Sequence, residues 1–160
     1  MIRHAGEQDI SRIAELLVFG KRTAYRDIFQ DDVGSFQGLQ VLGVIKEYQQ
    51  NSVLLENTLV YDDGIVKGMI GRGSPAETDE IELCDFYVEP VFQGMGIGQE
   101  LFQFFVREAK TAQKKKIFLW VLKENLSARK FYEGHGFAPD GQEKPVEGTQ
   151  VIEMKYVKDL

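Results

Sequence analysis

The sequence predicts an α/β fold of the α+β kind, in which helices cover both faces of a mixed sheet. Three observations indicate this fold. The strand-like stretch 81–88 leads through a glycine turn into a helical apolar pattern that ends near residue 112. The run 117–122 is apolar throughout, and Asp62-Asp63-Gly64 separates two further strand-like stretches. The resulting order of elements is βααβββαβαββ.

Composition limits the classes of protein to consider. A chain of 160 residues, 43% of them hydrophobic, can bury one core, so we expect a single domain, 1–160. The net charge of −6 argues against nucleic acid as a partner and suits a cationic substrate, although acidity can also serve solubility alone. With one cysteine, no secretory signal and no long apolar run, we expect a soluble cytoplasmic protein without a membrane partner.

The first half of the chain predicts a short strand at 1–5 and a helix capped by Asp9, which Gly20 interrupts. Apolar residues between 39 and 48 recur at broadly helical spacing, which indicates a second helix. Two strands, 53–61 and 65–71, then flank the Asp62-Asp63-Gly64 turn, because glycine tolerates the positive φ that tight hairpins need.

The second half begins with the strand 80–88. In the next segment, apolar residues share one face of a helix: Ile97, Leu101, Phe104, Phe105 and Ala109. The run 117–122 lacks polar alternation, so we expect a strand covered on both faces. A helix at 125–134, a strand from Phe137 and a last strand at 151–157 complete the prediction.

The glycine turn Gln93-Gly94-Met95-Gly96-Ile97-Gly98 lies where a strand becomes a helix. Glycines let the backbone approach a ligand, and the first amides of a helix carry partial positive charge, so this turn suits a phosphate or pyrophosphate. Gln99 rules out a G-x-G-x-x-G dinucleotide motif, and no Gly-Lys-Ser/Thr follows for a P-loop. An ordinary tight connection between strand and helix remains the alternative for this stretch alone.

A second motif, Asn125-x-x-Ala128-x-x-Phe131-Tyr132-x-x-x-Gly136-Phe137, follows downstream. Together with the glycine turn, it resembles the two signature motifs of the GNAT superfamily, the acetyl-coenzyme A-dependent N-acetyltransferases. The resemblance runs from about residue 1 to the end and is weakest in 21–50. It implies a largely antiparallel central sheet, acetyl-coenzyme A as co-substrate, a primary amine as acceptor and direct transfer in a ternary complex. A homodimer is one of the states that such proteins adopt.

The resemblance also implies where the coenzyme lies. Its pyrophosphate would meet the amides from about Met95 to Gln99, and a bulged central strand would offer free amides around Phe86 to Val88 to the pantetheine arm and the acetyl carbonyl. The coenzyme-binding residues expected on this basis are Phe86, Tyr87, Val88, Gln93, Gly94, Met95, Gly96, Ile97, Gly98, Gln99, Asn125, Ala128 and Arg129.

Acyl transfer to an amine requires a base, because only the neutral amine attacks. Glu82 is the candidate, eleven residues before Gln93, a spacing at which some relatives carry a strand glutamate. Glu80 and Asp85 compete for the role. Strand alternation places Glu80 and Glu82 on one face and Asp85 on the other, which favours Glu82 over either rival.

The departing thiolate benefits from a proton, and Tyr132 matches the tyrosine that lies near the coenzyme sulfur in many family members. Packing in the core is the alternative, and we expect that role for its neighbour Phe131, because successive helix positions differ by about 100°. Tyr25 and Phe29 fall in the region that overhangs the acceptor site in the resembled family. They are candidate substrate contacts, with packing on the sheet as the alternative.

No metal site is expected, because His4 and His135 have no ligand spacing with Cys84. Cys84 is predicted to be a small buried apolar residue rather than a nucleophile. A second class of function stays open at this point, a non-catalytic module of the same fold that binds an acyl-coenzyme A as a sensor. Glu82 and Tyr132 together favour the enzyme.

Overall fold

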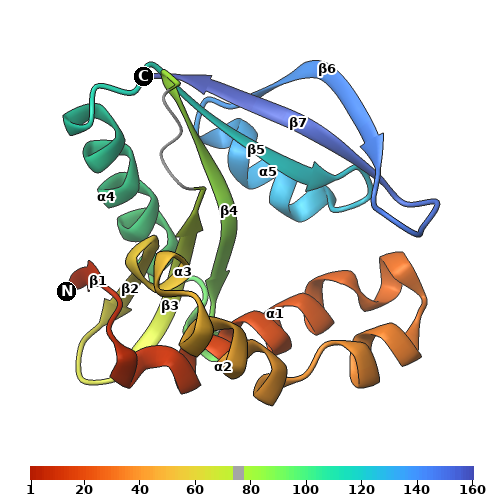
Figure 1. Cartoon of the computed structure of the whole chain (residues 1–160). Coiled ribbons are helices and arrows are strands. Elements are labelled where there is room, and N and C mark those ends of the chain that lie inside the picture. The colour runs from red at the N-terminus through yellow and green to blue at the C-terminus, as the bar shows by residue number, and fades with distance from the viewer. Residues whose placement is uncertain (74–77) are drawn as a thin grey trace.

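The computed structural model describes residues 1–73 and 78–160 (Figure 1). Its strands are β1 (Ile2–His4), β2 (Thr58–Asp62), β3 (Val66–Arg72), β4 (Glu80–Val88), β5 (Lys116–Leu122), β6 (Ala138–Pro145) and β7 (Ile152–Asp159). Its helices are α1 (Ile10–Phe29), α2 (Val41–Gln50), α3 (Ser52–Glu56), α4 (Ile97–Thr111) and α5 (Leu126–Gly134). The predicted order is confirmed apart from α3, a short helix that the sequence did not suggest.

The strands form one seven-stranded sheet in the order β1-β2-β3-β4-β5-β7-β6. Among the described strands, the β4–β5 pair alone is parallel, and it joins only Glu80 to Lys116, Ile81 to Ile117 and Glu82 to Phe118. Beyond these pairs the two strands separate, which Figure 1 shows as a divergence from a shared end. The sheet therefore opens in its middle, next to the second half of β4.

Helices cover both faces of the sheet, as predicted. On one face, α4 packs its apolar stripe, which includes Leu101 and Phe105, onto buried residues of β2, β3 and β4. On the other face, α1 and α2 bury residues such as Ile13 and Tyr48 against β2 and β3. Within the described residues, no helix combines the length and apolarity needed to cross a bilayer.

Three local predictions about secondary structure are wrong. Helix α1 continues through Gly20 to Phe29, so this glycine does not end the helix. Its role is close packing, because a Cβ atom there would overlap the Tyr87 ring. The strand expected at 53–61 begins only at Thr58, since residues 52–56 form α3, whose start is capped by the Asn51 side chain accepting a hydrogen bond from the Val53 N–H at 3.2 Å.

The third concerns β5, which was expected to be covered on both faces. Ile117, Leu119 and Val121 are buried on one face, whereas on the other face only Leu122, at the end of the strand, is buried. Phe118 and Trp120, on this second face, are half-buried. The Nζ atom of Lys155 lies 4.8 Å from the Phe118 ring centroid, and that of Lys144 lies 4.0 Å from the Trp120 ring centroid. Long lysine side chains can cover apolar rings while keeping their charge in water. Because these lysines belong to β6 and β7, the second face of β5 can be apolar, and the sequence of β5 shows no polar alternation.

A bulge in β4 corrects the predicted strand faces. Leu83 pairs with Arg72 and Asp85 pairs with Gly71, so Cys84 is an extra residue without a partner on β3. One extra residue inverts the alternation beyond it. Asp85 consequently lies on the same face as Glu82, and the prediction that they face opposite ways is wrong. The bulge that the family resemblance implied is thus present in β4, at Cys84, just before residues 86–88.

Candidate functional site

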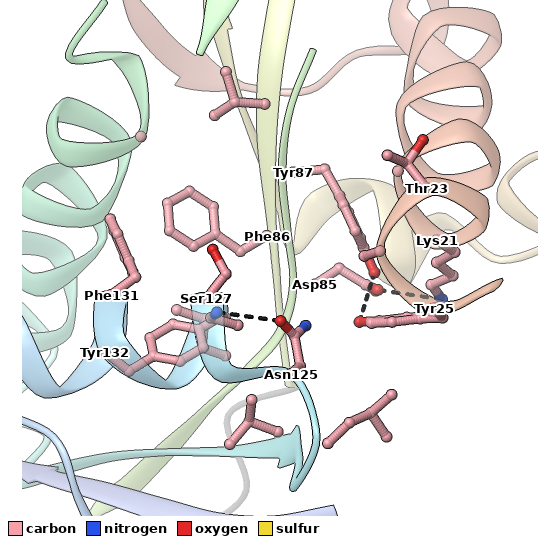
Figure 2. A pocket seen from close by; sticks show the side chains of 18 of the residues that line it. Lys21, Thr23, Tyr25, Asp85, Phe86, Tyr87, Asn125, Ser127, Phe131 and Tyr132 are labelled. Atoms are coloured by element: carbon pink, nitrogen blue, oxygen red, sulfur yellow. Dashed lines mark hydrogen bonds and ion pairs between the residues drawn. The ribbon is translucent and has the colours of Figure 1, made fainter. Parts of the chain in front are cut away.

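A cavity of about 1120 Å³ occupies the opening between β4 and β5. Its walls come from the second half of α1, from β4, from the turn before α4, from α5 and from the β5–β7 half of the sheet. Figure 2 shows side chains of α1 on one side of β4 and side chains of α5 on the other. Segments distant in sequence thus converge on one cavity, which is large enough for a cofactor-sized ligand.

The glycine turn forms one end of the cavity. Gly94 and Gly96 have φ values of 78° and 84°, which glycine adopts without strain, and α4 begins directly after Gly96 at Ile97. A Cβ atom at Gly96 would meet nothing within 4 Å, so the approach to the helix start is open. The first amides of α4 have no acceptor within the helix and carry its positive partial charge, so this end of the cavity suits an anion.

The backbone of β4 lines the middle of the cavity. The Glu89 N–H donates to the Lys67 carbonyl at 2.9 Å, and hydrogen bonding alternates along an antiparallel pair. Phe86 and Val88 therefore turn their backbone groups away from β3, toward the opening. The Gln93 side chain donates to the Val88 carbonyl at 3.1 Å, which agrees with this orientation. Free backbone donors of this kind can hold an amide-containing chain.

Glu82 lies on the cavity wall and is half-buried. In the part of the chain that the structure describes, no basic side chain lies within ion-pairing distance of it. Its rival Glu80 does not line the cavity and lies 3.9 Å from Lys116 Nζ. Asp85 lines the cavity but is 3.3 Å from Lys21 Nζ. Glu82 is thus the cavity carboxylate that remains available to accept a proton.

Cys84 is exposed, so its prediction as a buried residue is wrong. The bulge turns this side chain into the cavity beside Glu82 and Asp85. Desolvation of the thiolate by the surrounding protein, together with these two carboxylates, raises the pKa of the Cys84 thiol to about 12. The thiol is therefore a poor nucleophile at neutral pH. We still expect that Cys84 is not a nucleophile, but the reason is its raised pKa and not burial in the core.

Tyr132 of α5 lines the cavity and contacts the rings of Phe131 and Phe137, each with a centroid separation of 5.6 Å. Burial raises the pKa of its phenol, so the group stays protonated at neutral pH. Phe131 also lines the cavity, where its ring meets Phe86. The predicted division, with Phe131 in the core and Tyr132 in the cleft, is therefore too simple.

Tyr25 and Phe29 reach the cavity from α1, with their ring centroids 6.1 Å apart. The Tyr25 hydroxyl forms a hydrogen bond with the Tyr87 hydroxyl at 3.0 Å, one of the interactions drawn in Figure 2. The pKa of Tyr87 lies well above its usual value. Burial of the phenol is the main cause, and the nearby Tyr25 and Asp85 contribute less. These aromatic side chains form the wall opposite α5.

Two of the expected coenzyme-binding residues do not line the cavity. Met95 is exposed on the glycine turn. The Arg129 guanidinium donates to the Tyr156 hydroxyl at 3.0 Å and to the Lys123 carbonyl at 2.9 Å, which ties α5 to the sheet. Asn125 has a capping role, since its side chain accepts a hydrogen bond from the Ala128 N–H at 3.2 Å. The other expected residues all line the cavity: Phe86, Tyr87, Val88, Gln93, Gly94, Gly96, Ile97, Gly98, Gln99, Asn125 and Ala128.

Sequence reasoning missed several polar and aromatic residues of the cavity: Lys21, Trp120, Ser127, Lys144 and Glu153. Ser127 lies inside the second motif and could have been included. Lys144 and Glu153 form an ion pair at 3.4 Å across the β6–β7 hairpin. No local pattern links that hairpin to the cavity, because the parting of β4 and β5 alone creates the shared space. Among the described residues, no group of three or more His, Cys, Asp and Glu could hold a metal ion.

Comparisons with known proteins give one consistent result. The alpha-tubulin N-acetyltransferase of Phytophthora infestans is 37% identical over 76 residues, a match that covers 41% of this chain and 41% of that protein. An N-acetyltransferase of Staphylococcus aureus Mu50 has a similar structure, with a TM-score of 0.77 and 19% identity over 98% of this chain and 99% of that one.

The PaiA N-acetyltransferase of Thermoplasma acidophilum, solved in complex with coenzyme A, has a TM-score of 0.75 and 19% identity over 100% of this chain and 98% of that one. At such identity these structures establish the fold alone. The model of the acetyltransferase (GNAT) family matches residues 22–137, which include the glycine turn, Glu82 and the second motif. The chain therefore belongs to the acetyltransferase (GNAT) family.

Proposed function

We propose that this protein is an N-acetyltransferase that moves the acetyl group of acetyl-coenzyme A to a primary amine by direct attack in a ternary complex. One observation carries the proposal: one cavity has a helix start suited to an anion at one end, a glutamate without an ion pair among the described residues on its wall, and a protonated tyrosine on α5. Residues for each part of the reaction thus face the same space.

The residues at the glycine turn fit a coenzyme. The open, positive-φ backbone at Gly94 and Gly96 admits a pyrophosphate to the first amides of α4. The outward-facing backbone of Phe86 and Val88 would then hold the amide-containing arm along β4. When bound, acetyl-coenzyme A supplies an acyl group activated as a thioester. The PaiA structure, described as a coenzyme A complex, supports this placement by its similar fold.

Glu82 is the proposed base. It would take the proton from the acceptor ammonium, directly or through a water molecule, so that the neutral nitrogen can attack. Glu80 is disfavoured because it lies outside the cavity beside Lys116, and Asp85 because its carboxylate is already paired with Lys21. The backbone N–H groups of β4 facing the opening would stabilise the oxyanion that forms on the acetyl carbonyl.

Tyr132 is the proposed acid. Its hydroxyl would donate a proton to the sulfur as the carbon–sulfur bond breaks, and its raised pKa keeps this proton in place at neutral pH. The acceptor would enter from the α1 side, past Tyr25 and Phe29, so that the two substrates approach from opposite sides of β4.

The proposal is tested by release of free thiol from acetyl-coenzyme A in the presence of a panel of amines, with Glu82→Gln as the diagnostic variant. Glutamine keeps the size of the side chain and cannot accept a proton, so kcat should fall roughly 10²–10⁴-fold at neutral pH. The loss should shrink as rising pH deprotonates the amine without help.

Glu80→Gln is the matched control, since it removes a neighbouring carboxylate on the same strand outside the cavity. Normal turnover in Glu82→Gln across the pH range would transfer the role of base to another group. If the wild-type protein binds acetyl-coenzyme A and releases no thiol with any amine, the proposed reaction is wrong and a binding module would be the better description.

A further inference from the structure

The β4 bulge places a second carboxylate, that of Asp85, on the acceptor side of the cavity. Opposite it on β3 lies Gly71, where an added Cβ atom would come within 3.3 Å of the Asp85 Cβ. The absence of a side chain at Gly71 leaves room for Asp85 to occupy this position. The Tyr25–Tyr87 hydroxyl pair lies near it (Figure 2).

The carboxylate of Asp85 is already paired with a cation, the ammonium of Lys21. Lys21 Nζ, reaching over from α1, is 3.3 Å from Asp85 Oδ1, and both side chains line the cavity. The Lys21 side chain is 36% exposed and the Asp85 side chain 25% exposed, so the pair lies at the cavity rim and keeps contact with solvent. Such a pair contributes little stability, and a competing ammonium can replace Lys21 at small cost.

The strand register gives the spacing between the backbone positions of Glu82 and Asp85, which share one face of β4. The Glu82 carbonyl accepts a hydrogen bond from the Gly73 N–H at 2.8 Å, whereas Asp85 is opposite Gly71. Two residues of extended β3 thus separate the positions, a span of about 7 Å. An acceptor whose reacting nitrogen lies at Glu82 would place a second nitrogen at Asp85 if a short, flexible chain joined the two.

The remaining charges of the cavity do not oppose such a ligand. Besides Glu82 and Asp85, the charged residues that line it are Lys21, Lys144 and Glu153. Lys144 is paired with Glu153 at 3.4 Å, and its ammonium lies over the Trp120 ring. The carboxylates therefore outnumber the lysines, which favours a cationic acceptor.

We infer that Asp85 is a specificity-determining residue that binds the second ammonium of a diamine acceptor, and that Lys21 occupies this position when no acceptor is present. The inference rests on the proposed N-acetyltransferase activity and defines its acceptor class as short aliphatic diamines. Transfer itself is unchanged: the reacting nitrogen loses a proton to Glu82 and gains the acetyl group, while the distant ammonium keeps its charge.

The test compares butylamine with diaminobutane, which differ by one terminal ammonium. The wild-type kcat/KM should be roughly tenfold higher for the diamine than for butylamine. The diamine has two equivalent amines, but this statistical advantage alone is smaller than the expected preference. Asp85→Asn should abolish this preference. Lys21→Met should increase it by about two- to fivefold, because the competing cation is gone.

The double variant Asp85→Asn with Lys21→Met separates the lost carboxylate from the freed lysine, and it should still lack the diamine preference. Lys116→Met is the matched control, since it removes the lysine beside Glu80 outside the cavity and should leave the preference at the wild-type value. If butylamine is acetylated but the preference is absent in the wild type or survives Asp85→Asn, this inference is wrong and the proposed function stands. If neither amine, nor any other, is acetylated, both fall.

Discussion

Tyr132 illustrates how burial can suit a residue to its proposed role. A phenol with a raised pKa holds its proton at neutral pH, although it gives that proton up less readily to water. The same shift makes the phenol a weaker acid, so donation to sulfur is favourable only as negative charge develops there in the transition state. The burial and the proposed acid role are therefore compatible.

Tyr132→Phe removes only the hydroxyl and keeps the ring contacts with Phe131 and Phe137. We expect kcat to fall about 10–10³-fold, less than for the base, because a thiolate already leaves readily. The loss is measured by single-turnover kinetics with two acetyl donors, acetyl-coenzyme A and an analogue whose thiol is more acidic. The better leaving group should rescue the variant more than the wild type, and a defect confined to coenzyme affinity would make Tyr132 a binding residue.

At the scale of the element, the start of α4 depends on a backbone that only glycine adopts readily. Gly96 has a φ of 84° and immediately precedes Ile97, and no neighbouring atom would block a side chain there. The space that remains open is the space proposed for the pyrophosphate. The charge of a side chain placed at residue 96 should therefore change the affinity for an anion bound there.

The matched pair Gly96→Asp and Gly96→Asn tests this placement. Asn and Asp have nearly the same shape and both tolerate a positive φ, so the two variants differ chiefly in charge. Gly96→Asp should bind coenzyme A at least tenfold more weakly than Gly96→Asn, which corresponds to about 1.4 kcal/mol. Isothermal titration calorimetry measures the difference, and equal affinities would mean that the pyrophosphate lies elsewhere.

At the scale of the whole molecule, the cavity exists because α1 packs close to the sheet at the point where β4 and β5 part. Gly20 permits this approach, since a Cβ atom there would overlap the Tyr87 ring. Tyr87 in turn holds Tyr25 by its hydroxyl. We propose that residues 1–160 form one domain, so a displacement of α1 should affect stability and the acceptor side together.

Gly20→Ala should lower the free energy of unfolding by about 1–3 kcal/mol, because a rigid ring and a helix backbone must move apart. Gly43→Ala is the matched control: Gly43 lies within α2 and its Cβ would meet nothing within 4 Å. There the higher helix propensity of alanine should add up to about 1 kcal/mol. Chemical denaturation measures both, and a Gly20→Ala protein as stable as the wild type would show that the contact is not tight.

The sequence by itself determined the order of elements apart from α3, and it located the glycine turn and the second motif, both of which contribute residues to the cavity. Those features are local: Pro90 follows the end of β4, the glycine turn fixes where α4 begins, and the capped helix after Asn125 carries Tyr132 at a set position. Periodicity and turn chemistry depend on residues a few positions apart, so they can be read along the chain. Glu82 could be selected in the same way, from its spacing to the turn.

Only the tertiary structure decided the acceptor side. One extra residue at Cys84 moved Asp85 to the face of Glu82, and a sequence does not show which residue of a strand is left unpaired. Lys21 meets Asp85 across the gap between α1 and β4, and the β6–β7 hairpin contributes Lys144 and Glu153. These residues meet because strands separate and a helix approaches, and both events depend on packing between segments distant in the chain.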